Sequence, residues 1–343
     1  MSALSQQNNK RIAKNTLLLY FCMLFSMGIG LFTSRIVLES LGIEDYGIYN
    51  LVGGIVTIFA FLNSAMIATS QRFISYELGK GNLHKLKDVF CTTLTIHIAI
   101  AFIIVVLSEV IGVWFLNTKL NIPSDRMMAA NWTLQLSIFV FAVNVISVPY
   151  NASIVAHEKM SAFAYISIFE VSLKLAIAYL LLFISYDKLI VYSILVFCVA
   201  LLLRSLYCFY CKRHFEECHY TFSFNIEQFR EMFAFAGWSL VGNLGFSFKD
   251  QLSNILLNLF FGTVVNAARG ISVQVGSLIN SFSANFMMAM NPQITKSYAV
   301  GDLYRSKELV YAGCRFSFYL LAVISLPIMI NITSVSYTHL RAH

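Results

Sequence analysis

Charged residues are scarce in this chain: Lys, Arg, Asp and Glu together make up 12% of its 343 residues. Hydrophobic residues account for 58%, and the mean hydropathy is +0.71. A soluble domain of this length needs more polar side chains than this to cover its surface. The formal net charge of +7 therefore belongs to a protein of the lipid bilayer. We expect membrane lipids, and no nucleic acid, among its partners.

Motifs of nucleotide-using enzymes are also missing. The sequence contains no phosphate-binding Walker loop and no paired glycine-rich dinucleotide signature, so it predicts no cofactor. The segments between its apolar runs are short, whereas a membrane glycosyltransferase or polymerase should carry a large loop with clustered carboxylates or histidines. The sequence therefore favours a non-enzymatic function. A membrane enzyme acting on lipid-linked sugars is the alternative from another class, and a mass change in such a lipid without any gradient would support it.

The seven cysteines form no disulfide pattern. Four of them lie in apolar runs and are expected to be packing residues. The other three lie with two histidines near the end of the sixth apolar run, but a single Cys-x-x-Cys that continues a helix cannot easily bring its thiols onto one ion. We therefore predict no metal site at this cluster, which comprises Cys208, Cys211, His214, Cys218 and His219.

Long apolar runs are what the chain has in abundance. A helix needs ~20 apolar residues to cross the hydrocarbon core, where its backbone groups find no water and must pair internally. The first run is longer than a signal-peptide core and lacks a cleavage site, so we expect it to stay as a span. The predicted spans are 16–38, 47–69, 89–116, 128–155, 163–184, 189–210, 232–261, 264–290 and 309–330.

An internal repeat sets the predicted architecture. Residues 41–90 reappear without a gap as residues 261–310, so that Gly42 returns as Gly262 and Gly81 as Gly301. This period is too long for a solenoid and indicates a duplicated helical bundle. Further matched pairs are Ile55 and Val275, Ile74 and Ile294, Ser75 and Thr295, Leu83 and Leu303, Lys85 and Arg305, Lys87 and Lys307, and Asp88 and Glu308.

The basic residues predict the orientation, because short cytoplasmic loops hold an excess of Lys and Arg. The opposite side holds only Lys119, Arg126 and Lys188. We therefore expect a cytoplasmic amino terminus. Six spans precede the second copy, so both copies run the same way, as parallel repeats do. The basic side holds Lys10, Arg11, Lys14, Lys80, Lys85, Lys87, Lys159, Lys212, Arg213, Arg230, Lys296, Arg305 and Lys307.

The predicted fold is an all-α polytopic membrane protein with two parallel-repeat six-helix lobes, the second of them incomplete. We expect residues 1–220 to form the first lobe and residues 221–332 the first three helices of the second, about nine transmembrane helices in total. Two whole copies would need roughly 440 residues, so we expect a fragment. Residues 334–343 resemble translated sequencing-adapter sequence. We accordingly expect residues 333–343 to be a non-native tail.

A set of short motifs resembles a known family. The motifs are Ser34-Arg35, Leu41-Gly42, Tyr46-Gly47, Arg72-Phe73, Gly79-Lys80-Gly81, Pro149-Tyr150 and Ala156-His157-Glu158-Lys159. Their pattern resembles the polysaccharide-transporter branch of the multidrug/oligosaccharidyl-lipid/polysaccharide flippase superfamily, which includes the O-antigen flippases. The resemblance implies two six-helix lobes around a central cavity that opens alternately to each side of the bacterial cytoplasmic membrane. It also implies an undecaprenyl-diphosphate-linked sugar as the substrate, for surface polysaccharide or lipopolysaccharide synthesis.

Basic residues inside the predicted spans are functional candidates, because an unpaired charge in lipid is costly. They are Arg35, Arg72, Lys174, Lys249 and Arg269. The structural alternative is that arginines near span ends extend to the headgroups. The repeat helps to decide, because a requirement of the fold should act on both copies. In the other copy Arg35 corresponds to Ile255, Arg72 to Pro292, Lys249 to Ile29 and Arg269 to Tyr49. None of these matched residues is charged, and this asymmetry favours ligand binding.

Two further polar groups lie in the spans. Glu170 and Lys174 are four residues apart on one helical face, where they can neutralise each other or leave one partner for a ligand or proton. In the seventh span a polar stripe must face protein or water, and Lys249 lies about a third of a turn away from it. The stripe consists of Asn243, Ser247, Asp250, Asn254 and Asn258.

These observations predict a transporter that flips an anionic lipid-linked oligosaccharide outward by alternating access. Cationic side chains would hold the diphosphate, since arginine bonds phosphate in a bidentate way. The alternative within the superfamily is a cation-coupled multidrug exporter, which needs a carboxylate in its cavity; Glu170 and Asp250 are the candidates. The sequence leaves the glycan, the coupling ion and the oligomeric state open.

Overall fold

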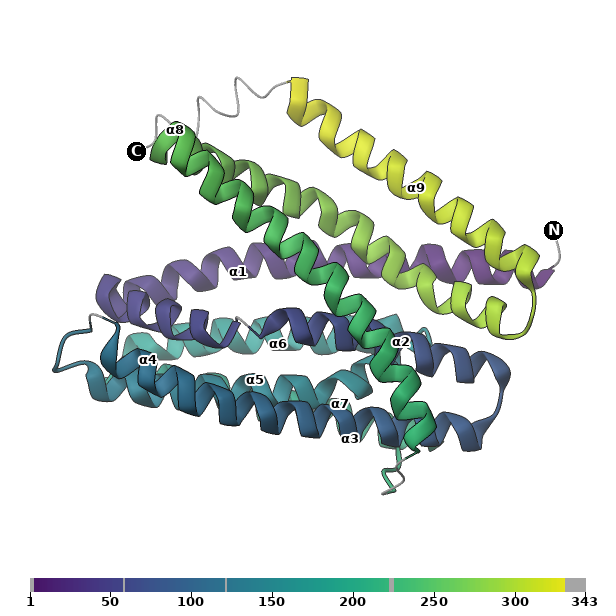
Figure 1. Cartoon of the computed structure of the whole chain (residues 1–343), viewed down its shortest axis with the longest axis horizontal. Coiled ribbons are helices and arrows are strands. Elements are labelled where there is room, and N and C mark those ends of the chain that lie inside the picture. The colour runs from purple at the N-terminus through teal and green to yellow at the C-terminus, as the bar shows by residue number, and fades with distance from the viewer. Residues whose placement is uncertain (1–2, 58, 121, 222–224, 331–343) are drawn as a thin grey trace. The chain divides into compact units, whose positions relative to one another are not determined.

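The computed structural model describes residues 3–57, 59–120, 122–221 and 225–330; the side chains of residues 3–8 and of most positions between 246 and 274 lie outside the description. Every regular element in these ranges is a helix (Figure 1). Within these described ranges, six helical segments are long and apolar enough to cross a membrane. The predicted class, an all-α polytopic membrane protein, is confirmed. The six segments are Asn9–Val56, Leu83–Thr118, Met127–Ala156, Met160–Phe183, Lys188–His214 and Leu303–Pro327.

The chain forms two compact units. The N-terminal unit runs from Phe21 to Asn243, and the C-terminal unit joins the residues up to Tyr20 with those from Leu244 onwards. The predicted lobes divide the chain at residue 220 instead. Residues 1–20 correspond to residues 221–240 through the repeat, so each copy contributes its first turns of helix to the unit of the other copy. The boundary at residue 220 separates the two copies of the repeat, whereas the two units group the residues that pack together.

Helix α5 is the centre of the N-terminal unit. It contacts α7, α3 and α2 most extensively, and small and aliphatic side chains such as Ala130, Leu134 and Ile138 are fully buried along it. The helices of this unit are most of α1 (Ala3–Thr57), α2 (Ala60–Lys80), α3 (Leu83–Leu107), η1 (Ser108–Gly112), α4 (Val113–Thr118), α5 (Met127–Ala156), α6 (Met160–Leu180), η2 (Leu181–Phe183), α7 (Lys188–His214), η3 (Glu216–Cys218) and the start of α8 (Ile226–Ala299).

Helix α1 contains a sharp kink. Gly42 has φ 81° and ψ 168°, a backbone conformation outside the helical region that glycine adopts without a steric penalty. Figure 1 shows α1 turning back there, so that it supplies the first predicted span and the start of the second. The second span, predicted as one helix over 47–69, is wrong in that respect. Helix α1 ends at Thr57 and α2 begins at Ala60, because the Phe59 amide bonds to the Val56 carbonyl in a tighter turn.

The repeat is visible in two matching turns. Gly81 (φ 72°) separates α2 from α3, and Gly301 (φ 82°) separates α8 from α9 (Leu303–Ile330). After each glycine a side-chain oxygen caps the next helix: Asn82 accepts from the Lys85 amide at 3.1 Å, and Asp302 accepts from the Arg305 amide at 2.9 Å. The two copies therefore fold alike at this turn, as their sequences predict.

Helix α8 is 74 residues long, far more than one crossing of a membrane requires. Its ribbon reverses direction near its label in Figure 1, so it forms two arms. The predicted spans 232–261 and 264–290 both fall in this helix, and most of the side chains between them lie outside the described residues. These spans and the second one are not among the six apolar segments named above.

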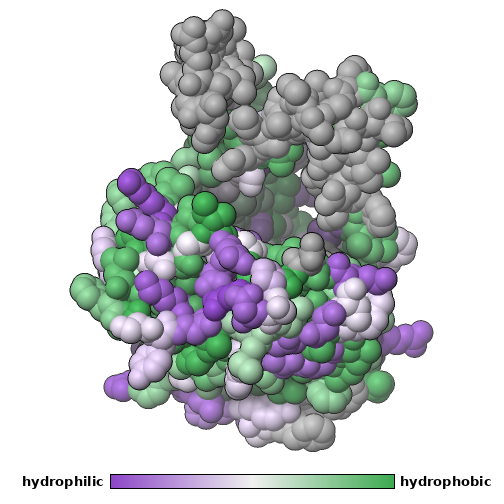
Figure 2. Space-filling view, turned by 90° about the vertical axis from the view of Figure 1, so that its left-hand side faces the viewer, coloured by the Kyte–Doolittle hydropathy of each residue, from purple (hydrophilic) through white to green (hydrophobic). Residues whose placement is uncertain are grey.

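The surface of the N-terminal unit follows the pattern of a membrane bundle. Figure 2 looks onto the end where α4 leads into α5, and hydrophilic residues gather there while hydrophobic residues cover much of the flank. Polar groups at this end are held by an ion-pair network. Arg126 donates to Asp187 at 2.8 Å and also to Asp45, which joins α1, α5 and α7. Burial lowers the pKa of Arg126, but its hydrogen bonds to Asp45 and Asp187 outweigh that effect and raise the pKa overall.

Candidate functional site

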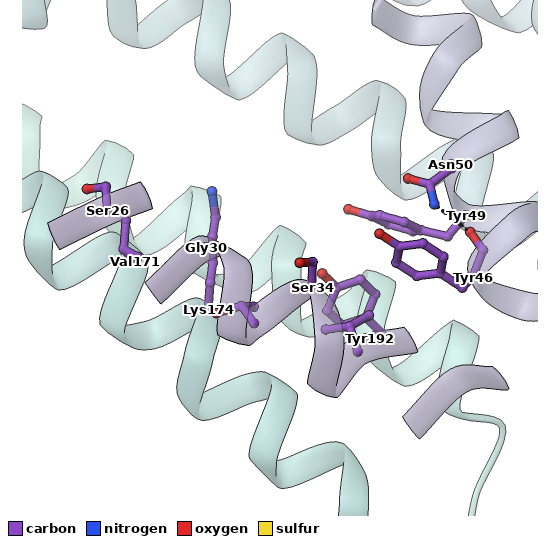
Figure 3. A pocket seen from close by; sticks show the side chains of 11 residues that line it. Ser26, Gly30, Ser34, Tyr46, Tyr49, Asn50, Val171, Lys174 and Tyr192 are labelled. Carbon is purple, nitrogen blue, oxygen red and sulfur yellow. Dashed lines mark hydrogen bonds between the residues drawn. The ribbon is translucent and has the colours of Figure 1, made fainter. Parts of the chain in front are cut away.

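An open pocket of about 300 Å³, lined by several polar side chains and called the polar pocket below, lies in the N-terminal unit. Both sides of the α1 kink contribute to its wall, since Ser26 and Ser34 precede Gly42 and Tyr46 follows it. The kink therefore places two segments of one helix around the same cavity. Helices α6 and α7 complete the wall, which consists of Ser26, Gly30, Thr33, Ser34, Val37, Tyr46, Tyr49, Asn50, Val171, Lys174 and Tyr192 (Figure 3).

Lys174 is the charged side chain of this wall. Its Nζ donates to Glu170 Oε1 at 2.6 Å, one turn earlier on α6, so the predicted i,i+4 pair is formed. The side chains of Lys174 and Glu170 are 45% and 33% exposed. The pair is therefore not sealed in a dry interior, and an anion entering the pocket can compete with Glu170 for the ammonium group.

The rest of the wall supplies hydroxyl groups and one amide. Figure 3 shows the phenol groups of Tyr46 and Tyr49 pointing towards the side of the pocket where Lys174 lies. The rings of Tyr49 and Tyr192 meet edge to face with centroids 5.0 Å apart, which holds both phenols in place. The amide of Asn50 is bonded to the Tyr46 carbonyl at 2.9 Å. One ammonium group surrounded by hydroxyls can bind a phosphate and the hydroxyls of a sugar.

Sequence reasoning missed the tyrosines of this pocket. Aromatic residues make up 15% of the chain, so their presence in a span carries no signal. What brings Tyr46, Tyr49 and Asn50 to the pocket is the reversal of α1 at Gly42. The available hints were the recurrence of Gly42 as Gly262 and the presence of Leu41-Gly42 and Tyr46-Gly47 among the family motifs.

Arg72 lies elsewhere in the same unit. Its guanidinium carbon is 4.1 Å from the ring centroid of Phe235 and 6.0 Å from that of Phe73. These are cation–π distances, and the two rings also meet each other at 6.2 Å. In the described part of the chain no carboxylate forms an ion pair with Arg72. It is thus a cation held by aromatic faces rather than a member of the polar pocket.

The remaining predicted residues are not brought into the pocket by the described structure. Arg35 is exposed on α1 beside Ser34. The Asn243 amide donates to the Ser64 hydroxyl at 3.1 Å, which ties α8 to α2. Lys249 and Arg269 lie on α8 in the C-terminal unit, and each has an interaction partner. The side chains of Asp250 and Asn254 lie outside the described residues. The ligand-binding roles of all these residues stay predictions.

The cysteine and histidine cluster is part of a packed connection after α7. His157 Nε2 and Glu217 Oε1 are 2.6 Å apart, the Glu217 side chain is 2% exposed, and His157 stacks on the ring of Phe215. The Cys211 thiol donates to the Tyr150 carbonyl at 3.4 Å. A hydrogen bond with Cys211, together with burial, raises the pKa of the Cys218 thiol, so this thiol stays protonated. The cluster anchors the chain between the two copies to the end of α5.

The sequence matches the model of the family described as polysaccharide biosynthesis protein, over residues 12–333. The chain belongs to this family. It is also 19% identical over 305 residues to the uncharacterized membrane protein EpsK of Bacillus subtilis, a match that covers 88% of this chain. The chain spans 59% of the length of that relative.

Solved structures show the same fold. The chain is similar to an outward-facing multidrug resistance MATE family transporter of the MOP superfamily, with a TM-score of 0.82 and 13% identity over 96% of this chain and 74% of the other. A MOP superfamily transporter from Pyrococcus furiosus, whose description notes a reverse polarity of the binding pocket, gives a TM-score of 0.77 and 14% identity with the same coverage. The family member described here thus has the fold of the MOP superfamily transporters.

Proposed function

We propose that this family member is a transporter that flips a lipid-linked anionic oligosaccharide across the bacterial cytoplasmic membrane, with its amino terminus in the cytoplasm. The observation that carries the proposal is the polar pocket, in which Lys174 is the one charged residue of the wall. The family description as a polysaccharide biosynthesis protein supports a glycan substrate. No catalytic step is required, because the substrate changes sides and not its covalent structure.

The pocket residues suggest how the head group is held. The Lys174 ammonium group can leave Glu170 and bond an anionic group of the head, while the hydroxyls of Tyr46, Tyr49 and Tyr192 bond sugar hydroxyls. When that anionic group leaves, Glu170 takes the ammonium group back at its present distance of 2.6 Å. Because the ligand must compete with Glu170 for the ammonium group, its net affinity stays low enough for release. The ligand then favours one conformation of the transporter only by its difference in affinity for the two conformations.

A cation-coupled drug exporter is the second candidate, because several similar structures are MATE transporters. Such an exporter needs a carboxylate that is available in the cavity. Glu170 is the acidic group adjacent to the pocket, and it is engaged by Lys174. The Pyrococcus furiosus relative, described by a reverse polarity of its pocket, is a precedent for a different polarity within the same fold. The charge of the wall therefore favours an anionic substrate.

The test is transport by Lys174→Gln, with Lys174→Arg as its partner. Each variant is placed in the native gene and expressed in a strain that lacks its own flippase, and surface glycan is normalised to protein in the membrane. We expect Lys174→Gln to lose most transport and Lys174→Arg to keep part of it, because only the latter keeps the positive charge. Unchanged surface glycan with Lys174→Gln would contradict the role given to Lys174, whereas drug efflux with no surface glycan from the unaltered protein would establish the exporter.

A further inference from the structure

An apolar groove of about 420 Å³ lies in the N-terminal unit between α2, α3 and the first arm of α8. Its rim includes Ile103 and Phe233, which are 54% and 66% exposed. In a membrane protein such exposed apolar residues face the lipid, so the groove opens towards hydrocarbon. Four of its lining residues are small, Ala65, Ala99, Ala236 and Gly237; Ala65 and Ala236 are buried, whereas Ala99 and Gly237 are exposed.

The residues that line this groove differ in size from those at the matched positions of the other copy, so the shared fold alone does not produce the groove. The matched positions of the C-terminal unit carry larger side chains, since Ala99 corresponds to Tyr319 and Gly237 to Leu17. Leu240 and Leu62 line the groove, and their counterparts Tyr20 and Phe282 are two rings in contact, with centroids 5.5 Å apart. The counterparts of Met66 and Ile96 are likewise two rings in contact, Phe286 and Phe316, at 6.1 Å. The C-terminal unit thus carries aromatic rings at several positions where the groove is lined by small and aliphatic residues.

A cation lies at one end of the groove. Arg72 is roughly two turns along α2 from the groove residue Met66. Phe73 packs against the cluster that contains Met66 and Met232, and the ring of Phe235 lies under the Arg72 guanidinium at 4.1 Å. This arrangement is also confined to one copy, because the counterparts of Arg72 and Phe235 are Pro292 and Asn15. An apolar groove with an arginine at its end matches a molecule with one hydrocarbon chain and a phosphate.

We propose that this groove binds the polyprenyl chain of the lipid-linked substrate, with a phosphate of that lipid at Arg72. The identity of the ligand rests on the proposed function. A membrane phospholipid fits less well, because it has two chains and the groove is a single cavity. The site is separate from the polar pocket of Lys174, with which it shares no lining residue. It assigns Arg72 to the phosphate end of the tail and Lys174 to the sugar-bearing head.

Photolabelling of the purified protein tests the site. The probe is a polyprenyl phosphate with a diazirine in its chain, and labelled peptides are identified by mass spectrometry. We expect labels on the groove segments of α3 and α8. Ala99→Tyr and Gly237→Leu introduce the residues found at the matched positions of the other copy and should abolish this labelling. Ile98→Tyr is the matched control, because Ile98 is an exposed neighbour outside the groove, and it should label normally.

The phosphate contact has its own readout. Arg72→Gln should lower labelling by polyprenyl phosphate roughly tenfold, to the level of the uncharged polyprenol. Arg72→Lys should lie between the two. Each variant is first checked for a single symmetrical peak in size-exclusion chromatography. Equal or stronger labelling by a diazirine phosphatidylglycerol, or labelling that Ala99→Tyr and Gly237→Leu leave unchanged, would overturn the proposal.

Labelling does not require transport, so the two proposals can fail separately. Lys174→Gln should lose most transport and leave labelling of the groove intact, since Lys174 lies in the other pocket. Groove labelling in a protein that transports no glycan refutes the proposed function alone. Transport without groove labelling refutes the tail site alone.

Discussion

At the scale of single residues, several charged side chains of this protein form defined ion pairs or ring contacts. Lys174 and Glu170 form the pair that their spacing of four predicts, and Arg126 satisfies two aspartates at once. Arg72 instead rests on aromatic rings. A sequence gives the spacing of an i,i+4 pair directly, because both residues lie on one helix. It does not give the partner of Arg72, because Phe235 is far away in the chain.

The predicted ligand-binding role of three arginines can be tested by substitutions that remove the positive charge or change the geometry of the cationic group. Replacing Arg35, Arg72 or Arg269 by Gln should reduce transport at unchanged abundance if they bind a diphosphate, and Lys should rescue only in part because it loses the bidentate bonds. Residues that merely reach the headgroups behave differently: Lys would serve as well as Arg, and Ala would lower abundance and activity together. Surface glycan per membrane protein is the measurement. Wild-type transport by all three Gln variants contradicts the prediction.

The buried carboxylate after α7 gives a stability prediction. Glu217 is 2% exposed and is paired with His157 at 2.6 Å. Replacing His157 by Ala removes the hydrogen-bond partner of this buried side chain and should destabilise the N-terminal unit by about 1–3 kcal/mol. Thermal unfolding in detergent measures the effect. Glu216→Gln is the control, since Glu216 is an exposed neighbour and should change the melting temperature little; an equal loss in both variants would contradict the prediction.

At the scale of elements, turns were more predictable than spans. Gly81 and Gly301 recur in the sequence and both adopt a positive φ, because only that conformation lets α2 lead directly into α3. The break between Thr57 and Ala60 was not predictable, since the run 47–69 is mostly apolar and contains no proline, and such a composition does not reveal a local change of hydrogen-bonding pattern. The pocket depends on such local backbone events, so its tyrosines escaped prediction.

The two turn glycines should respond alike to substitution. Gly81→Ala and Gly301→Ala should each lower the free energy of unfolding by about 1–2 kcal/mol, because the Cβ of alanine is sterically unfavourable at φ values of 72° and 82°. No heavy atom lies within 4 Å of the added Cβ at either site, so the cost is one of backbone conformation. Thermal unfolding is the readout. Gly28→Ala, inside helix α1 and equally uncrowded, should stabilise instead; a similar gain at Gly81 would contradict this account.

The network around Arg126 allows the roles of its two aspartates to be separated. Asp187 also accepts from the amides of Leu189 and Ile190, at 3.1 and 3.3 Å, and so caps α7. We expect Asp187→Ala to cost about 1 kcal/mol more than Asp45→Ala, the usual value of such a cap. Denaturation of both variants measures the difference, with the exposed Asp125→Ala as the control. Equal costs would show that the cap contributes nothing here.

At the scale of the whole molecule, the duplication predicted two lobes. The packing shows in addition that the two copies exchange their first helical segments. Ile12 packs with Met290 and Leu309, and Tyr20 meets Phe282, so the start of the first copy belongs to the C-terminal unit. The start of the second copy packs in the N-terminal unit, where Met232 lies with Met66 and Ile96. A repeat shows that two copies exist, but side chains in contact decide which unit each segment joins.

This exchange predicts that separated halves hold together. Residues 1–220 and 221–343, expressed as two chains, should copurify through one tag, because each half supplies helix to the unit of the other. Replacing both Ile12 and Met232 by Asp should release the untagged half, since each buries an apolar side chain at the exchange. Size-exclusion chromatography of the tagged eluate measures it. Halves that elute separately without any substitution would contradict the prediction.

The same exchange has a consequence for the order in which the protein matures on the ribosome. The residues up to Tyr20 leave the ribosome first, yet their partners around Phe282, Met290 and Leu309 are translated much later. The opening segment must therefore wait in the membrane with an apolar face that nothing yet covers. The N-terminal unit also waits, until Met232 and Ala236 arrive to close over α2 and α3. Nascent chains stopped before Met232 should therefore be protease-sensitive at positions that are protected once synthesis has passed Asn243.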